Sequence, residues 1–340
     1  PMKTAIVGAS GYAGTELLRL LLDHPNFEPT VITAHSNAGE LITSVAPQLA
    51  KLGDRRFEAF ELAKVNACDL VFLALPHGES AALIAQLDPN LKVIDLGADF
   101  RLTSAEKWAQ YYGGTHAGTW TYGLPELPGQ REVIAKSTRV ANPGCYATSI
   151  SLAIAPALEL IDIKDIVVVA ASGTTGAGRS AKVNLLGSEV MGSLSSYKFG
   201  GVHQHTPEIE EALSRTAGSD VKISFTPILA PMPRGILSTV TAKLTATATT
   251  ETVHALYTTA YSADEFVTVL PIGQMPKTNS VVGSNHVHLQ VAVDPHTNRL
   301  IVSAVIDNLG KGAASQAIQN ANLICGLPEN TGLATLGLGV

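Results

Sequence analysis

Residues 3 to 14 read Lys3-Thr4-Ala5-Ile6-Val7-Gly8-Ala9-Ser10-Gly11-Tyr12-Ala13-Gly14, and a leucine-rich segment follows as far as Leu22. The apolar run predicts a buried strand, and the leucines predict a helix. Glycines between a strand and a helix let the backbone approach a pyrophosphate at the positive helix start. The spacing is GxxGxxG instead of GxGxxG, and a tight turn without a ligand is the alternative. We predict a dinucleotide-binding loop with contacts at Gly8, Ser10, Gly11, Tyr12, Ala13 and Gly14.

Strands and helices alternate through the rest of the first half. Apolar runs at 27–34, 70–75 and 91–96 predict three further strands, and 80–87 predicts a short helix. This alternation indicates β–α–β units, so we predict an α/β fold with a doubly wound parallel sheet of Rossmann type. Pro76 ends the third of these strands, and we include it among the cofactor contacts.

The end of the second strand bears on the choice of cofactor. NAD-binding sheets usually carry an acidic residue there that holds the ribose 2′-hydroxyl. This chain instead has Thr33-Ala34-His35-Ser36-Asn37. Ser36 and Asn37 are able to donate to a 2′-phosphate, although no arginine stands beside them. We therefore expect NADP in preference to NAD.

The second half has a different pattern. Runs at 166–171, 221–229, 236–244, 267–270, 287–293 and 300–306 predict strands, several of which alternate apolar and polar residues. Most connections between them are loops. This pattern indicates an α+β domain with a mixed, mostly antiparallel sheet and helices on one face. Residues 312–325 predict a closing amphipathic helix, and the domain boundary is expected near Cys145.

Composition narrows the class of protein. A chain of 340 residues suggests two domains, and 46% hydrophobic with 15% charged residues fits buried parallel strands and a subunit interface. The apolar runs are too short to span a bilayer, and the first residues predict a strand instead of a signal peptide. The net charge of −6 argues against nucleic acid as a partner. Three scattered cysteines favour a reducing cytoplasm.

Cys145 is the candidate nucleophile. It lies in Asn142-Pro143-Gly144-Cys145-Tyr146, between a strand-like run at 134–141 and an apolar, helix-like run at 147–160. A thiol at a helix start faces the positive end of the helix dipole, which lowers its pKa and favours the nucleophilic thiolate. The alternative is a small residue that fills the core.

Two histidines, His203 and His205, are candidates for an acid/base. In an extended segment they would share one face, and one of them is sufficient for proton transfer. No further ligands stand at spacings typical of zinc, so we expect no metal site. Two surface histidines at a helix start are the alternative.

Three arginines are candidates for binding anions. Arg179 ends a small-residue loop at 171–178 that is able to form an anion-binding nest, and Arg101 and Arg234 lie at strand ends or in loops. Arginine pairs bidentately with carboxylate or phosphate. Structural ion pairs for Arg101 and Arg234, and a plain connection at 171–178, are the alternatives.

Several motifs occur together and in order: the glycine loop, Asp99-Phe100-Arg101-Leu102, Tyr122-Gly123-Leu124-Pro125-Glu126-Leu127, the Cys145 motif, residues 172–179, residues 203–208 and Asp307-Asn308-Leu309-Gly310-Lys311-Gly312. The set resembles the N-acetyl-gamma-glutamyl-phosphate reductase family over nearly the whole chain. That family belongs to a wider group with aspartate-semialdehyde dehydrogenase and glyceraldehyde-3-phosphate dehydrogenase. One departure is Ala147, where the family has proline.

The resemblance implies reduction of an acyl phosphate by NADPH through a thioester on Cys145. His205 is the first choice for the acid/base and His203 the second, with Glu208 as a group to orient an imidazole. Arg101 is expected to bind phosphate, and Arg179 and Arg234 the substrate carboxylate. Asn142 is a further substrate contact, and Gly176 and Asn308 are cofactor contacts, Asn308 near the nicotinamide.

The resemblance also implies a discontinuous cofactor domain, residues 1–145 and 307–340. Residues 146–306 would form the catalytic and oligomerisation domain of a homodimer or homotetramer. Three alternatives stay open: an aminoadipyl-phosphate reductase, a cofactor-free cysteine acyltransferase or hydrolase, and a non-catalytic NADP-binding protein. One extra methylene changes binding by only about 1–3 kcal/mol, so the sequence does not separate the two reductases.

Overall fold

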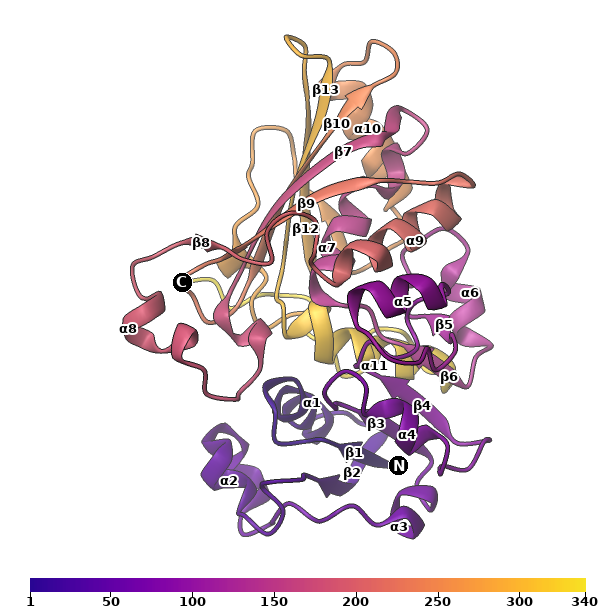
Figure 1. Ribbon diagram of the computed structural model, residues 1–340, viewed down its shortest axis with the longest axis vertical. Helices are drawn as coiled ribbons and strands as arrows, with labels where there is room; N and C mark the ends of the chain where they lie inside the picture. Colours follow the sequence, from indigo (N-terminus) through magenta and orange to yellow (C-terminus); the bar gives the residue numbers. More distant parts are fainter.

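The computed structural model describes residues 1–340 and contains two sheets, one above the other in Figure 1, with a helix between them. The first sheet has six strands, and every neighbouring pair is parallel. In spatial order they are β2 (Phe27–Thr33), β1 (Met2–Val7), β3 (Leu70–Leu73), β4 (Lys92–Asp95), β6 (Arg139–Ala141) and β5 (Thr121–Tyr122). The order reverses between β1 and β3, as it does at the ligand-binding edge of doubly wound sheets.

Both faces of the first sheet are covered, which explains why its strands are apolar at successive positions. Ile6, Phe72 and Ile94 point into a core that they share with α1 (Tyr12–Leu22). Their neighbours along the strands point into a second core, beneath α3 (Leu62–Asn66) and α4 (Ser80–Ile84). The predicted doubly wound parallel sheet is confirmed.

The second sheet has seven strands, and four of its six pairings are antiparallel. Their spatial order is β11 (Val267–Val269), β12 (Val287–Asp294), β13 (Arg299–Ile306), β10 (Ile236–Leu244), β7 (Ile161–Ser172), β9 (Ile223–Leu229) and β8 (Ser195–Ser196). Three helices cover one face and complete the largest core: α7 (Cys145–Ile154), α9 (His205–Ala217) and α10 (Thr250–Ala260). The mixed, mostly antiparallel sheet is as predicted.

The opposite face of this sheet has no helix on it, and apolar side chains reach solvent there. Val167 and Val169 of β7 are 37% and 42% exposed, and Ile301 of β13 is 37% exposed. Their neighbours along the strands, such as Val168 and Val302, are fully buried under the helices. A row of exposed valine and isoleucine on an open sheet is a surface suited to a subunit contact.

The closing helix differs from the prediction. It begins with a π-helical turn, Gly310–Ala314, and continues as α11 (Ser315–Ile324). It is not amphipathic with one solvent face, because nearly all its residues are buried, including the polar Gln316, Gln319, Asn320 and Asn322. The helix lies between the two sheets (Figure 1), and its Ala317, Ile318 and Ala321 join the core beneath α1. The polar residues of this segment suggested a face exposed to solvent. In the structure most of them instead form hydrogen bonds with other residues inside the protein.

Two boundaries near Cys145 also differ. The run 134–141 is not one strand: α6 (Gln130–Ala135) comes first, and β6 starts only at Arg139. The helix begins at Cys145 and ends at Ile154, before a short 3-10 turn that contains Pro156. Proline lacks the N–H that would continue the α-helical bonding, which explains the early end.

The remaining elements are short. They are α2 (Ile42–Val45), α5 (Ala105–Tyr111) and α8 (Gly187–Val190), the last in a segment that projects beside β8 in Figure 1. None of the helices has the length and apolar character needed to cross a membrane.

Candidate active site

The loop that carries the thiol joins the end of β6 to the start of α7, so Cys145 is the first residue of a helix, as predicted. Its backbone is held from several sides. Asn142 N–H donates to Asp95 O (2.8 Å), and Arg101 Nε donates to Asn142 O (2.8 Å). Asn142 Nδ2 donates to Ala313 O (3.0 Å). Asn142 therefore fixes the loop instead of offering its amide nitrogen to a substrate.

Glu208 holds the next part of the loop. Its Oε2 accepts hydrogen bonds from Gly144 N–H (2.9 Å) and from the Tyr122 hydroxyl (2.5 Å). Its Oε1 lies 3.4 Å from Arg101 NH1, and both side chains are almost fully buried. No hydrogen bond joins Glu208 to His203 or His205, so the expected role of orienting an imidazole is not supported.

Arg101 is anchored inside the protein. It donates to Asn142 O, Leu96 O and Glu208. Burial opposes its charge, but the carboxylate of Glu208 and several neighbouring groups together offset burial and raise the pKa of Arg101. These bonds use three of the five N–H groups of a guanidinium, and Arg101 also lines a cavity with Thr103 and Tyr122, so its role in binding phosphate stays a prediction.

The pKa of Cys145 differs from the prediction. Burial raises the pKa of this thiol to about 11. The N–H groups of Tyr146 and Cys145 and the charge of Arg101 act in the opposite direction but are smaller. The helix start is present as predicted, but desolvation of the charged form outweighs it. A thiol with a raised pKa is mostly protonated near neutral pH, so formation of the thiolate needs a base.

His205 is placed to be that base. It is the first residue of α9, and its imidazole lies so close to Gly144 that a Cβ there would collide with Nε2. Only glycine leaves room for the ring against the turn that carries Cys145. Burial lowers the pKa of His205, and the neighbouring His203 and Arg101 lower it further. The ring is therefore neutral, and its buried Nδ1 has no partner.

His203 has a different environment. It lies between two turn segments and outside any strand, and its Nδ1 accepts the backbone N–H of His205 (3.0 Å). Its ring packs edge-on against Tyr146 and Tyr197, and Phe225 lies beside it. Burial lowers the pKa of His203 to about 3. This histidine therefore supports the backbone at His205.

The glycine loop has the shape that a dinucleotide requires. Gly8 has φ +84°, and a Cβ there would lie 2.5 Å from Ala74 O; a Cβ on Gly14 would strike Ala9. Beside Gly11, in contrast, nothing lies within 4 Å of where a Cβ would stand. Gly11 caps α1 without a side-chain hydrogen bond, so the N–H groups of the first turn face open space. The residues present thus fit a pyrophosphate.

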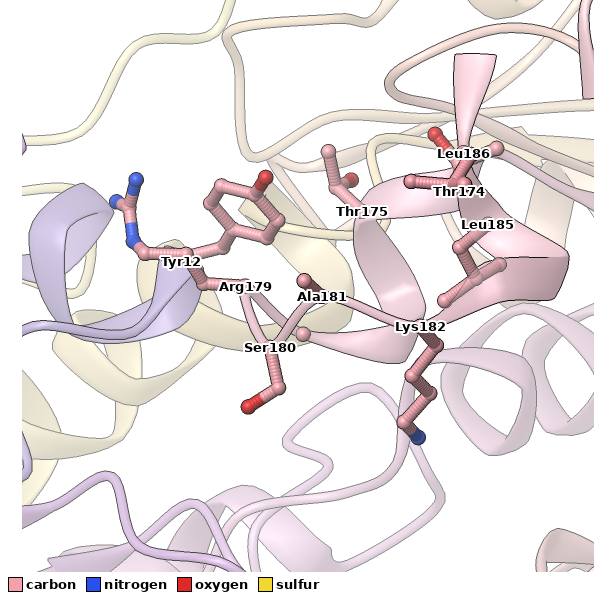
Figure 2. Close-up of a pocket in the computed structure, with 10 residues that line it drawn as sticks. Tyr12, Thr174, Thr175, Arg179, Ser180, Ala181, Lys182, Leu185 and Leu186 are labelled. Carbon is pink, nitrogen blue, oxygen red and sulfur yellow. The ribbon is translucent and has the colours of Figure 1, made fainter. Parts of the chain in front are cut away.

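Arg179 lies on this loop. Its Nε donates to Ser10 O (2.7 Å), its NH2 donates to Thr15 Oγ1 (3.2 Å), and the guanidinium stands over the Tyr12 ring. Figure 2 shows Tyr12 and Arg179 lining one pocket with Thr175, Lys182 and neighbouring residues. Arg179 therefore lies against the glycine loop that is predicted to bind the cofactor, and its contact with a substrate carboxylate stays a prediction.

The other predicted cofactor contacts are scattered around the loop edge. Pro76 follows β3, next to the point where the strand order reverses. Ser36 is exposed, and Asn37 Nδ2 donates to Glu40 (3.1 Å). Asn308 bonds Gly235 N–H (2.7 Å) and Thr175 Oγ1 (3.0 Å), and Gly176 lies beside it.

Arg234 is part of an ion-pair cluster instead of a substrate pocket. It makes a bidentate contact with Asp307 (3.1 and 2.7 Å) and a further bond with Glu16 of α1 (3.0 Å). Asp307 is fully buried and Glu16 nearly so. The predicted contact with a substrate carboxylate is not supported, because two carboxylates of the chain already occupy this side chain.

The sequence analysis included Tyr122 and Gly312 in its motifs but gave neither a role at the site, although a Cβ on Gly312 would lie 2.9 Å from Cβ of Cys145. It also missed the contact between Glu208 and Gly144. No local signal marks these residues, since each lies far along the chain from its partner. No group of three or more histidine, cysteine, aspartate or glutamate side chains is arranged to hold a metal ion.

Comparison with known proteins gives the relationship. The N-acetyl-gamma-glutamyl-phosphate reductase of Acidothermus cellulolyticus is 57% identical over 338 residues, which cover 99% of this chain and 98% of that protein. The chain belongs to the N-acetyl-gamma-glutamyl-phosphate reductase family. The Streptomyces coelicolor protein of that name is 53% identical over 99% of both chains. Family models match as well: "semialdehyde dehydrogenase, NAD binding domain" at 3–137 and "semialdehyde dehydrogenase, dimerisation domain" at 145–308.

Solved structures show the same fold at low identity. Aspartate-semialdehyde dehydrogenase from Candida albicans, with NADP, matches with a TM-score of 0.72 at 15% identity, over 96% of this chain and 99% of that one. Aspartate-semialdehyde dehydrogenase II from Vibrio cholerae matches with a TM-score of 0.71 at 16% identity, over 95% and 98%. The predicted resemblance to aspartate-semialdehyde dehydrogenase is therefore confirmed at the level of the fold.

Proposed function

We propose that this protein reduces N-acetyl-L-glutamyl 5-phosphate to N-acetyl-L-glutamate 5-semialdehyde with NADPH, in arginine biosynthesis, releasing phosphate. One observation carries the proposal: the neutral His205 ring lies against the turn that presents Cys145, in a chain that also has a glycine loop shaped for a dinucleotide. Relatives at 52–57% identity over nearly the whole chain, all named for this activity, support it.

The chain's residues perform the covalent steps. His205 takes the thiol proton, and Cys145 Sγ attacks the acyl carbon, so that a C–S bond forms and the bond to phosphate breaks. The backbone N–H groups at the start of α7 stabilise the developing oxyanion. Bound NADPH supplies the hydride that reduces the thioester. His205 then manages the proton as the thiohemiacetal collapses to the aldehyde and restores Cys145.

Different parts of the chain hold the two reactants. We propose that residues 1–145 and 307–340 form the cofactor domain, because α11 completes the core beneath α1. Residues 146–306 would supply His205 and the subunit contact. The first turn of α1 and Arg179 would hold the phosphates of NADP.

We propose a homo-oligomer that forms through the uncovered face of the second sheet, where Val167, Val169 and Ile301 are exposed. The match to a model described as a dimerisation domain supports this. Three free cysteines, none of which forms a disulfide, favour a reducing compartment such as the cytoplasm.

The test runs the reaction backwards. The purified protein is mixed with NADP, phosphate and either N-acetyl-glutamate semialdehyde or the aminoadipate homologue, and formation of NADPH is followed. We expect turnover with the first substrate, a preference for NADP over NAD, and none in Cys145→Ser, which should still bind NADPH. Cys68→Ser is the matched control and should retain activity. Faster turnover of the longer semialdehyde would assign the lysine-pathway reaction instead, and phosphate release from the acyl phosphate in the absence of NADPH would indicate a hydrolase.

A further inference from the structure

The turn that carries Cys145 and the helix that carries His205 are joined by one side chain. Glu208 lies one helical turn after His205 on α9, and its carboxylate accepts the N–H of Gly144 at 2.9 Å. Gly144 is the residue immediately before Cys145 and is also the residue against which the His205 ring packs. The carboxylate of Glu208 therefore connects the helix that carries His205 to the turn that carries Cys145, and it does so through the backbone N–H of Gly144.

The contact is built to be rigid. Glu208 is 2% exposed, and its Oε2 also accepts the Tyr122 hydroxyl, while Arg101 faces Oε1. Arg101 in turn bonds the carbonyl of Asn142 in the same turn (2.8 Å). The Glu208–Arg101 pair thus forms hydrogen bonds with two backbone groups of the turn, the N–H of Gly144 and the carbonyl of Asn142. Buried charge-assisted bonds of this kind are shorter and stronger than neutral ones.

We infer that Glu208 is a positioning residue for the reaction, which fixes the Cys145 turn relative to His205 through its bond to Gly144 N–H. The inference rests on the proposed function for its catalytic meaning. Geometry of this kind matters because a shift of about 1 Å in reacting groups lowers the rate by about 100-fold. A helix that slides by such a distance on the turn would carry His205 away from the thiol.

Two substitutions of Glu208 separate the effect of its side-chain length from the effect of its charge. Glu208→Asp keeps a carboxylate opposite Arg101 but shortens the side chain, so that it no longer reaches Gly144 N–H. Glu208→Gln keeps the length and an oxygen for Gly144 but removes the charge. We expect Glu208→Asp to lower kcat by about 10–100-fold with the Michaelis constants changed less than threefold. Glu208→Gln should retain kcat within about fivefold, although it unfolds more easily because Arg101 stays buried without an anion.

Glu211 provides the matched control. It lies one turn further along α9, is 7% exposed, and accepts the N–H groups of Thr103 (2.8 Å) and Ser104 (3.1 Å), away from the Cys145 turn. Glu211→Asp should release those amides and cost similar stability, yet leave kcat within about twofold. The comparison removes any general effect of weakening α9.

Hydrogen exchange supplies a readout that needs neither substrate nor cofactor. Glu208→Asp should speed exchange in the peptide that contains Gly144, and Glu211→Asp in the peptide that contains Thr103. Equal kcat in Glu208→Asp and Glu211→Asp would overturn the inference, as would a larger kcat loss in Glu208→Gln than in Glu208→Asp. If Glu208→Asp fails to fold, Glu208→Gln decides, because a kcat more than about fivefold below that of the wild type would show that charge instead of reach is needed and would overturn the inference. A wild type without turnover would instead refute the proposed function.

Discussion

At the scale of single residues, the side chain that packs against Gly144 distinguishes the two histidines of the candidate site. The ring of His205 occupies the space that a side chain there would fill, whereas His203 lies among aromatic rings and bonds only the backbone of His205. The two histidines are one residue apart in the sequence but have different surroundings. These surroundings favour His205 as the proposed acid/base and His203 as a support of the helix start.

The histidine pair yields a direct prediction. His205→Asn should lower kcat by about 10²–10⁴-fold and flatten its pH profile, because the group that takes the thiol proton is lost. The Michaelis constants should change little. His203→Asn should lower kcat by less than tenfold and mainly reduce the free energy of unfolding, since it removes aromatic packing. Both are measured as kcat against pH and by urea unfolding. A larger kcat loss in His203→Asn would reverse the assignment.

At the scale of elements, α1 is tied to the end of β13 by Arg234. This arginine bonds Glu16 in the middle of α1 and Asp307 directly after β13. The glycine loop starts α1, and Asn308 follows Asp307, so the cluster joins two segments that are predicted to face the cofactor. The position of α1 against the second sheet thus depends on ion pairs as well as on apolar packing.

Arg234→Met should lower the free energy of unfolding by on the order of 3 kcal/mol. Asp307 is fully buried and would keep its charge without the arginine, which is the costly way to break a buried pair. Arg19→Met is the control, because Arg19 bonds the same Glu16 but is 41% exposed, and it should cost at most about 1 kcal/mol. Urea unfolding measures both. Unchanged stability, with a raised Michaelis constant for the acyl phosphate, would return Arg234 to the substrate site.

At the scale of the whole molecule, the two sheets differ in how many of their faces are covered by helices. The first is covered on both faces, whereas the second is covered on one and exposes valines and an isoleucine on the other. Burial of that face against a second copy would make the second sheet as dry as the first. Such a contact would explain the high fraction of hydrophobic residues in the chain, because it would bury apolar side chains that the single copy leaves exposed.

Val169→Asp tests this surface. A carboxylate in the middle of the contact would be desolvated in both copies, so the dimer should weaken by about 100-fold or more. Val133→Asp is the control, because Val133 is 49% exposed and belongs to α6, outside the second sheet. The Val133→Asp protein should have the same size in solution as the wild type. Analytical ultracentrifugation over a range of concentrations gives the result. A Val169→Asp protein of unchanged size would place the interface elsewhere.

The sequence by itself determined the elements that have short-range causes. The glycine loop, the parallel strands and the helix start at Cys145 follow from apolar runs and from glycine between a strand and a helix. The strand 236–244 was predicted to the residue, since its alternation of buried and open positions is regular. The family relationship also followed from motifs in order along the chain. These features depend on neighbours that are close in sequence.

Only the tertiary structure decided what each charged group does. Arg101 and Arg234 are identical in type to an arginine that binds substrate, but buried carboxylates from distant segments already pair with them. The thiol at the helix start has a raised pKa because the protein surrounds it, and no local pattern reports desolvation. The closing helix carries polar residues yet lies inside, because their partners come from other elements. Burial and pairing are properties of the folded chain, since they depend on residues that only folding brings together.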